Sequence, residues 1–107
     1  MDMGRPQDPM QMPVQDDWCV LIEENTAAGE YSVWALTHVR VFRSRADAVL
    51  DASIMARQYQ PRILGKIVGR WIFRTGEDIW TVQVRGKAAF LTRDVHFRIS
   101  VAKPEPV

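Results

Sequence analysis

Cysteine, lysine and long apolar runs are all scarce in this chain of 107 residues. The single cysteine, Cys19, excludes an intrachain disulfide and favours a reducing compartment. No apolar run approaches the roughly 18 residues that a membrane-spanning helix requires, and the N-terminus lacks the apolar stretch of a signal peptide. From these absences we expect a cytoplasmic protein that has no membrane partner.

Residue patterns typical of catalysis, metal binding and cofactor binding are also missing. His38 and His96 fall on separate predicted strands, without a second cysteine or a carboxylate cluster to complete a zinc site. The glycines are spaced as in turns and bulges rather than as in a phosphate-binding loop. Cys19 has no evident base beside it and is typical of a small buried apolar residue. We therefore expect no catalytic residues, no metal site and no cofactor.

Arginine, by contrast, is abundant, with eleven arginines against three lysines. This bias is typical of a GC-rich bacterial genome, so the number of arginines alone does not indicate a function. Their distribution is more informative, because the formal net charge of +1 hides two opposed regions. Residues 1–17 carry four aspartates against Arg5, a net −3. Residues 40–74 carry eight basic side chains against Asp47 and Asp51, a net +6.

The chain divides into an arm, a domain and a short tail. Residues 1–17 contain three prolines and no aromatic side chain, and such a segment buries too little apolar surface to offset the entropy of ordering it. We predict a disordered acidic N-terminal arm over 1–17, a single domain over 18–102 and a frayed C-terminus over 103–107. The arm is either inert or shields the basic region until a partner displaces it.

Within the domain, β-type patterns surround one helical pattern. Short runs rich in valine, isoleucine and aromatic residues predict strands at 18–22, 31–42, 66–74, 79–85, 88–92 and 95–102, with a loop after residue 22. The long strand at 31–42 alternates between two faces, and a bulge within it could exchange them midway.

The helix is predicted over residues 45–60. Ser44 is a good N-cap, Asp47 places an acid in the first turn, and Pro61 ends the helix. The stripe of Val49, Ala52, Ala56 and Tyr59 is expected to pack on the sheet. The opposite stripe, facing solvent, is Asp47, Asp51, Ile54 and Gln58.

These elements predict an α+β fold in two layers, β-β-α-β-β-(β)-β, with one helix packed on one face of a mostly antiparallel sheet. One helix covers only one face, so the other is open, covered by a partner or curled on itself. The predicted inward residues are Trp80, Val82 and Val84 on one strand and Val95, Phe97, Ile99 and Val101 on another. The side chains expected on the open face are Trp34, His38, Arg40, Arg70, Arg74, Thr81, Gln83, Arg85, His96, Arg98 and Ser100.

The functional hypothesis follows from this face and from the helix N-terminus, where backbone N–H groups favour an anion. Arginine grips phosphate or carboxylate with two hydrogen bonds, and Trp34 could stack on a base. We expect a small noncatalytic binding module whose partner is anionic, either nucleic acid or an acidic protein surface. The alternative is a protein-interaction or homodimerisation module with no nucleic-acid role. The candidate binding residues are Trp34, His38, Arg40, Arg43, Arg45, Arg70, Arg74, Arg85 and Arg98.

Overall fold

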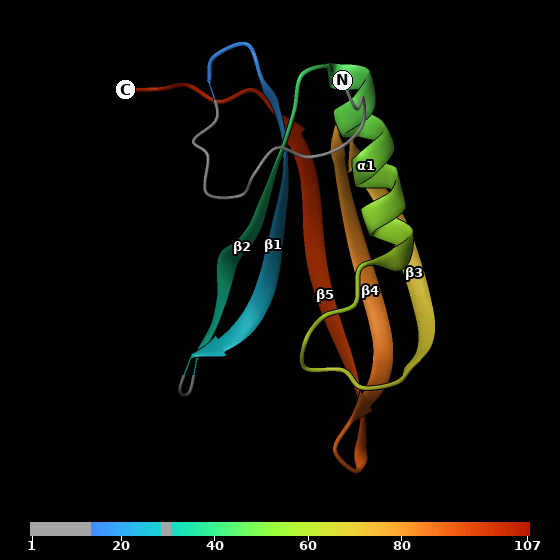
Figure 1. Cartoon of the computed structure of the whole chain (residues 1–107). Coiled ribbons are helices and arrows are strands. Elements are labelled where there is room, and N and C mark those ends of the chain that lie inside the picture. Colours follow the sequence, from blue (N-terminus) through green and yellow to red (C-terminus); the bar gives the residue numbers. More distant parts are fainter. Residues whose placement is uncertain (1–13, 29–30) are drawn as a thin grey trace.

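The computed structural model describes residues 14–28 and 31–107 of the chain. Within these residues, five antiparallel strands form one sheet in the order β2-β1-β5-β4-β3, and a single helix lies against one face of it (Figure 1). The elements, in chain order, are β1 (Trp18–Ala28), β2 (Tyr31–Phe42), α1 (Arg45–Gln58), β3 (Ile67–Gly76), β4 (Ile79–Ala88) and β5 (Leu91–Ala102). The predicted α+β class, with one helix and an antiparallel sheet, is confirmed.

The helix begins where its capping residues indicate. Ser44 is the N-cap, and its hydroxyl accepts a hydrogen bond of 3.1 Å from the backbone N–H of Asp47. The Asp47 carboxylate lies in the first turn, where the positive end of the helix dipole stabilises it. The helix ends at Gln58, slightly before the predicted end, because the C-cap residue Tyr59 already has extended backbone angles.

The core lies between α1 and the sheet face that the helix covers. Ala48, Ala52 and Ala56 are fully buried, and their short side chains let the helix approach the sheet closely. The other buried members of this core are Val20, Ile22, Phe42, Leu64, Trp80, Val82, Val84, Phe97, Ile99 and Val101. The inward residues predicted for the last two strands are thus found in the core or, for Val95, packed against it.

Three of the predicted loops and turns are wrong, namely those after residues 22, 85 and 92. Residues 23–28 continue β1 instead of forming a loop, and they pair with β2. At the other end of the chain, β4 continues to Ala88 and β5 starts at Leu91, so the predicted strands over 79–102 are two and not three. Gly86, predicted to lie in a turn, is instead within β4, where it lets the backbone of Lys66 approach closely. A Cβ at Gly86 would lie only 2.6 Å from the carbonyl oxygen of Lys66.

A bulge in β2 exchanges the two faces of that strand. Ile22 pairs with His38 and Glu23 pairs with Leu36, so Thr37 has no partner in the register. The Thr37 hydroxyl donates instead to the carbonyl of Ile22 at 3.2 Å. Because of this extra residue, even-numbered side chains before the bulge and after it lie on opposite faces.

The sheet also divides along part of its length. β1 pairs with β5 from Cys19 to Glu24 only, whereas it pairs with β2 as far as Ala28. The hairpin of β1 and β2 therefore separates from β5 towards the end where that hairpin turns (Figure 1).

Both ends of the domain carry local contacts. Of the predicted arm over 1–17, positions 1–13 lie outside the described residues. In the remainder, the N–H of Asp17 donates to the carbonyl of Val14, and the Asp17 carboxylate accepts from the N–H of Val14, both at 2.9 Å. Residues 103–107 have no regular secondary structure, and the Lys103 ammonium lies 5.3 Å from the centre of the Trp18 ring.

Candidate functional site

The strand register assigns every sheet residue to one of two faces, because residues paired across antiparallel strands point the same way. One row across all five strands consists of Arg74, Trp80, Ile99, Ile22 and His38. Its middle members are core residues beneath α1, so Arg74 and His38 lie on the helix side. By the same argument Arg40, paired with Val20, and Arg70, paired with Val84, lie there too. The prediction that these four side chains lie on the open face is wrong.

Two of these side chains bind the helix rather than a partner. The Arg40 guanidinium forms two hydrogen bonds, of 2.8 and 2.9 Å, with the carboxylate of Asp51. Asp51, predicted to face solvent, is consequently buried. The Arg70 guanidinium donates to the carbonyls of Ala56 and Tyr59 at 3.0 and 2.7 Å, and so it caps the C-terminal end of α1. Its partial burial lowers the pKa of Arg70.

The remaining helix-side residues also have partners in the chain. Arg74 donates to the carbonyl of Glu77, and its guanidinium lies 5.5 Å from the centre of the Trp80 ring. At the helix start, Arg43 precedes the N-cap, and Arg45 forms an ion pair with Asp78 in the turn between β3 and β4. Arg40 and Arg45 therefore connect the helix to β2 and to the turn between β3 and β4.

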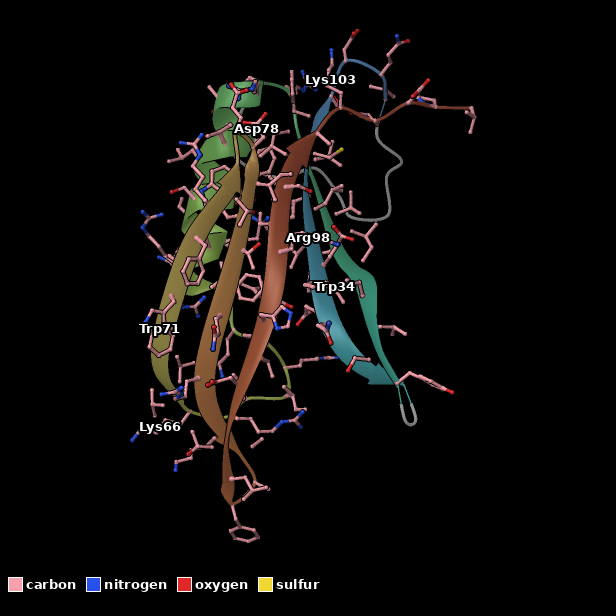
Figure 2. All side chains as sticks on the ribbon, turned by 180° about the vertical axis from the view of Figure 1, so that it is seen from behind. Trp34, Lys66, Trp71, Asp78, Arg98 and Lys103 are labelled. Carbon is pink, nitrogen blue, oxygen red and sulfur yellow. The ribbon has the colours of Figure 1, made fainter. Side chains whose placement is uncertain are left out.

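The opposite side of the sheet, here named the open face, has no helix on it. A row across all five strands consists of Phe73, Thr81, Arg98, Glu23 and Leu36. Neighbouring rows place Trp71, Gln83 and His96 on this face, and Asn25 and Trp34 beyond the point where β1 leaves β5. The predicted positions of Trp34, Thr81, Gln83, Arg85, His96, Arg98 and Ser100 thus agree with the register. Figure 2 labels Trp34, Trp71 and Arg98 on this side of the sheet.

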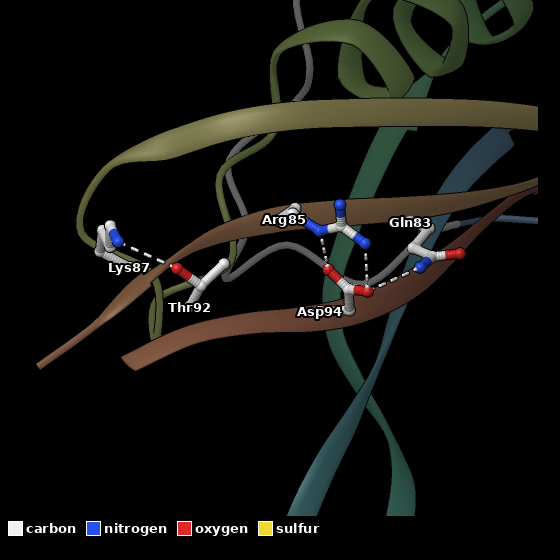
Figure 3. A network of polar contacts seen from close by, with 5 residues as sticks. All are labelled: Gln83, Arg85, Lys87, Thr92 and Asp94. Carbon is white, nitrogen blue, oxygen red and sulfur yellow. Dashed lines mark hydrogen bonds and ion pairs between the residues drawn. The ribbon is translucent and has the colours of Figure 1, made fainter. Parts of the chain in front are cut away.

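The centre of the open face is polar, and its arginines are paired. The Arg98 guanidinium forms two bonds to Glu23, of 3.2 and 3.3 Å, and lies 4.4 Å from the centre of the Trp34 ring. Arg85 forms two hydrogen bonds to Asp94, of 2.8 and 3.1 Å (Figure 3). Its guanidinium also lies over the Trp71 ring, 5.3 Å from the ring centre. This guanidinium holds the pKa of the Asp94 carboxyl below its usual range.

The two outer strands give the open face apolar rims, which sequence reasoning underestimated. On β3, Trp71 and Phe73 are 44% and 50% exposed. On β2, Trp34 and Leu36 are 40% and 56% exposed, with Val39 beside them. Strict alternation along β2 predicts His38 and Arg40 on the open face and Val39 on the core face. The bulge at Thr37 reverses this, so Val39 lies on the open face instead.

A cleft opens where the hairpin of β1 and β2 separates from β5. It consists of two adjoining pockets that share Glu24, Thr37 and Arg62. The larger, of about 560 Å³, is also lined by His38, Tyr59 and Gln60. The smaller, of about 240 Å³, is also lined by Asn25, Pro61, Ile63, Arg93, Val95 and His96. No sequence pattern indicated this cleft, because it depends on where two strands stop pairing.

Hydrogen bonds within the cleft hold Tyr59 in place. Its hydroxyl donates to the Glu24 carboxylate at 2.8 Å, and it lies 3.4 Å from Nδ1 of His38. Burial, followed by the hydrogen bond and the charge of Glu24, raises the pKa of Tyr59 to about 12. The phenol therefore keeps its proton and acts as a donor at neutral pH.

Other features restrict the chemistry of the described residues. Cys19 is buried, and desolvation together with the nearby Asp17 carboxylate raises the pKa of its thiol, which disfavours the reactive thiolate. Among residues 14–28 and 31–107, no three His, Cys, Asp or Glu side chains gather closely enough to hold a metal ion. The helix of this part of the chain is too short and too polar to cross a membrane.

No protein-family model, curated protein or solved structure matches this chain. Its function therefore has to be inferred from its own residues.

Proposed function

We propose that the chain is a noncatalytic interaction module whose open face binds a second copy of the same chain. The observation that carries this proposal is the exposure of large apolar side chains along both edges of one sheet face. Exposed apolar residues scattered singly are normal, but a set gathered on one face marks an interaction surface. Trp71 and Trp34 are of the residue type that contributes most to interfaces.

The pattern of the open face matches itself. Across the sheet it runs from the apolar rim on β3, through the polar centre, to the apolar rim on β2. If two such faces meet around a twofold axis lying between them, apolar rims contact apolar rims and polar centres contact polar centres. The charges do not oppose this contact, because Arg85 and Arg98 are paired with Asp94 and Glu23. Lys87, which pairs with Thr92 at the end of the same face, adds only one positive charge.

The size of the face suits a dimer of ordinary stability. Strands of 10 to 12 residues, in a sheet of five, give a face of roughly 35 by 20 Å, or about 700 Å². Stable protein interfaces bury about 800 Å² per partner. Contact over the whole open face, including the part beyond the split between β1 and β5, would therefore come close to this value.

Pairing through the sheet edges is less well supported. Both edge strands are irregular: β2 has its bulge at Thr37, and β3 has register shifts at each end, after Ile67 and after Arg74. Bulges disturb the row of backbone groups that another strand would need, and natural proteins use them to protect sheet edges. This favours face-to-face contact over edge pairing.

The hypothesis of an anionic macromolecular partner stays a prediction. The arginines that remain on the open face, Arg85 and Arg98, already bond carboxylates of the same chain. An incoming phosphate would have to displace Asp94 or Glu23, which lowers the gain from each contact. We therefore rank self-association first and nucleic-acid binding second.

A pair of matched variants tests the proposal. The open-face variant carries Trp71→Gln and Phe73→Gln, and the control carries Leu50→Gln and Ile54→Gln, two exposed apolar residues on α1. Loss of one tryptophan that is buried in an interface costs about 2 kcal/mol or more, which is roughly a 30-fold weaker association. Light scattering should show a dimer for the wild type and the control, and a 12.3 kDa monomer for the open-face variant. Equal association by all three proteins would refute the proposal, provided circular dichroism shows each to be folded.

A further inference from the structure

Two arginines at the cleft differ from most others in the chain. The guanidinium groups of Arg62 and Arg93 form no hydrogen bond or ion pair with any residue in the described ranges, 14–28 and 31–107. In contrast, a hydrogen-bond partner within the chain is present for Arg40, Arg45, Arg57, Arg70, Arg74, Arg85 and Arg98. Both of these guanidinium groups border the same pocket.

The acidic group of the cleft does not neutralise them. The Glu24 carboxylate accepts the hydrogen bond of Tyr59, and neither guanidinium bonds to it. With Glu24 counted, the cleft keeps one net positive charge when both histidines are neutral. Two unsatisfied guanidinium groups, each with donors in a planar fork, are suited to a carboxylate or a phosphate.

The remaining walls are partly apolar and partly polar. Pro61, Ile63 and Val95 line the smaller pocket beside the two arginines, and Pro61 is buried. His38, Gln60 and Thr37 contribute polar atoms to the larger pocket. Small-molecule sites generally combine apolar walls with a few polar groups that fix orientation. The larger pocket, of about 560 Å³, lies within their usual range of about 300–1,000 Å³, and the smaller, of about 240 Å³, lies just below it.

The cleft is held open by side chains at its two sides. On the helix side, Tyr59 packs edge-on against His38 and Phe97, with ring centres 5.2 and 5.1 Å apart. On the open face, Trp34 and His96 meet edge-on at 5.1 Å and bridge the gap between β2 and β5. These ring contacts lie on both sides of the cleft, so closing the cleft would require them to rearrange.

We propose that this cleft binds a small organic anion, with a carboxylate or phosphate head group held by Arg62 and Arg93. The apolar body of the ligand packs against Pro61, Ile63 and Val95. This inference is independent of self-association, because the arginines and the apolar wall lie at the split in the sheet and not on its apolar rims.

The test is a titration of the full chain, isotopically labelled and followed by amide NMR. The probes are benzoate, phenyl phosphate and the neutral analogue benzamide, which share an aromatic body and differ in the head group. Benzoate or phenyl phosphate should shift the resonances of residues 60–63 and 93–96, and benzamide should bind at least tenfold more weakly. Whichever anion binds more tightly identifies the head group.

Matched variants separate the proposed site from general electrostatic attraction. Arg62→Gln and Arg93→Gln should each weaken binding of the tighter probe at least tenfold. Arg57→Gln removes an equal charge from an exposed site that bonds only Ser53, and it should bind the probe as the wild type does. The inference is overturned if benzamide binds as well as the anions, if no probe shifts the cleft at millimolar concentration, or if Arg57→Gln weakens binding as much as the cleft variants do. The open-face variant with Trp71→Gln and Phe73→Gln should retain full binding, which keeps this result separate from the oligomeric state.

Discussion

Arg40 and Asp51 connect the second strand to the helix through two hydrogen bonds of 2.8 and 2.9 Å. The Asp51 side chain is only 9% exposed, so its carboxylate depends on these donors. Arg40→Gln removes both and leaves a nearly buried carboxylate with unsatisfied oxygens. We expect a loss of about 1–3 kcal/mol in the free energy of unfolding, measured by urea denaturation.

The control for this variant is Arg57→Gln on the exposed side of the same helix. Arg57 bonds only the hydroxyl and carbonyl of Ser53, so its loss should change stability by no more than about 0.5 kcal/mol. The double variant Arg40→Gln with Asp51→Asn should recover part of the loss, since no buried charge remains. Equal stability of the Arg40 and Arg57 variants would show that the ion pair contributes nothing.

The Tyr59 hydroxyl is expected to lose its proton only at high pH in an alkaline titration. Its pKa is about 12 in the folded chain, above the value near 10 of an unfolded tyrosine. A raised folded pKa stabilises the fold fully below pH 10, and this contribution disappears as the pH rises from 10 towards 12. Ultraviolet absorbance of phenolate should show one step near pH 12 that Tyr59→Phe removes. If Tyr59→Phe instead removes absorbance near pH 10 and leaves no difference near pH 12, the burial of the Tyr59 hydroxyl and its hydrogen bond to Glu24 would be contradicted.

The hairpin between β4 and β5 contains a strained residue. Ala89 has a φ of 55°, in the left-handed region, and it is the first residue of a two-residue loop, where glycine is preferred. Ala89→Gly should therefore stabilise the fold by about 1 kcal/mol, measured by the same denaturation. In the opposite direction, Gly86→Ala places a Cβ against the carbonyl of Lys66 and should destabilise it by about 1–3 kcal/mol. Destabilisation by Ala89→Gly would mean that this backbone conformation is not the one adopted in solution.

Nucleic-acid binding can be tested by anisotropy titration of mixed DNA and RNA at two salt concentrations. Each phosphate contact steepens the dependence of log affinity on log salt by about one unit. Because the arginines of the open face are paired with carboxylates, we expect weak binding with a slope of no more than one or two. A steep slope that flattens in an Arg43→Gln and Arg45→Gln variant would restore the hypothesis of an anionic macromolecular partner.

Local signals in the sequence predicted the helix and the strands that carry strict alternation. Ser44, Asp47 and Pro61 are short-range features whose effect depends little on the rest of the fold, and the helix begins as they indicate. Trp80 and Phe97 were placed in the core because their strands are regular and one face is covered. The α+β class follows from these elements alone.

The positions of the arginines could not be predicted in the same way. One unpaired residue, Thr37, exchanges the faces of β2, and nothing in its local sequence distinguishes it from its neighbours. The face of Arg70 and Arg74 depends on the register of β3 against β4, which is a long-range property. Predicting the cleft requires knowing where β1 stops pairing with β5, which the sequence does not indicate. Arg62 and Arg93, which line the cleft, were therefore not among the predicted site residues.

The central claim is that two open faces meet, and nuclear Overhauser contacts between chains test it most directly. The sample mixes isotopically labelled and unlabelled protein, and filtering selects only contacts between different chains. The account predicts such contacts from the side chains of Trp34, Trp71 and Phe73 on the two apolar rims. Contacts confined to the backbone of β2 or β3, or to α1, would contradict it, as would a sample at millimolar concentration that shows none.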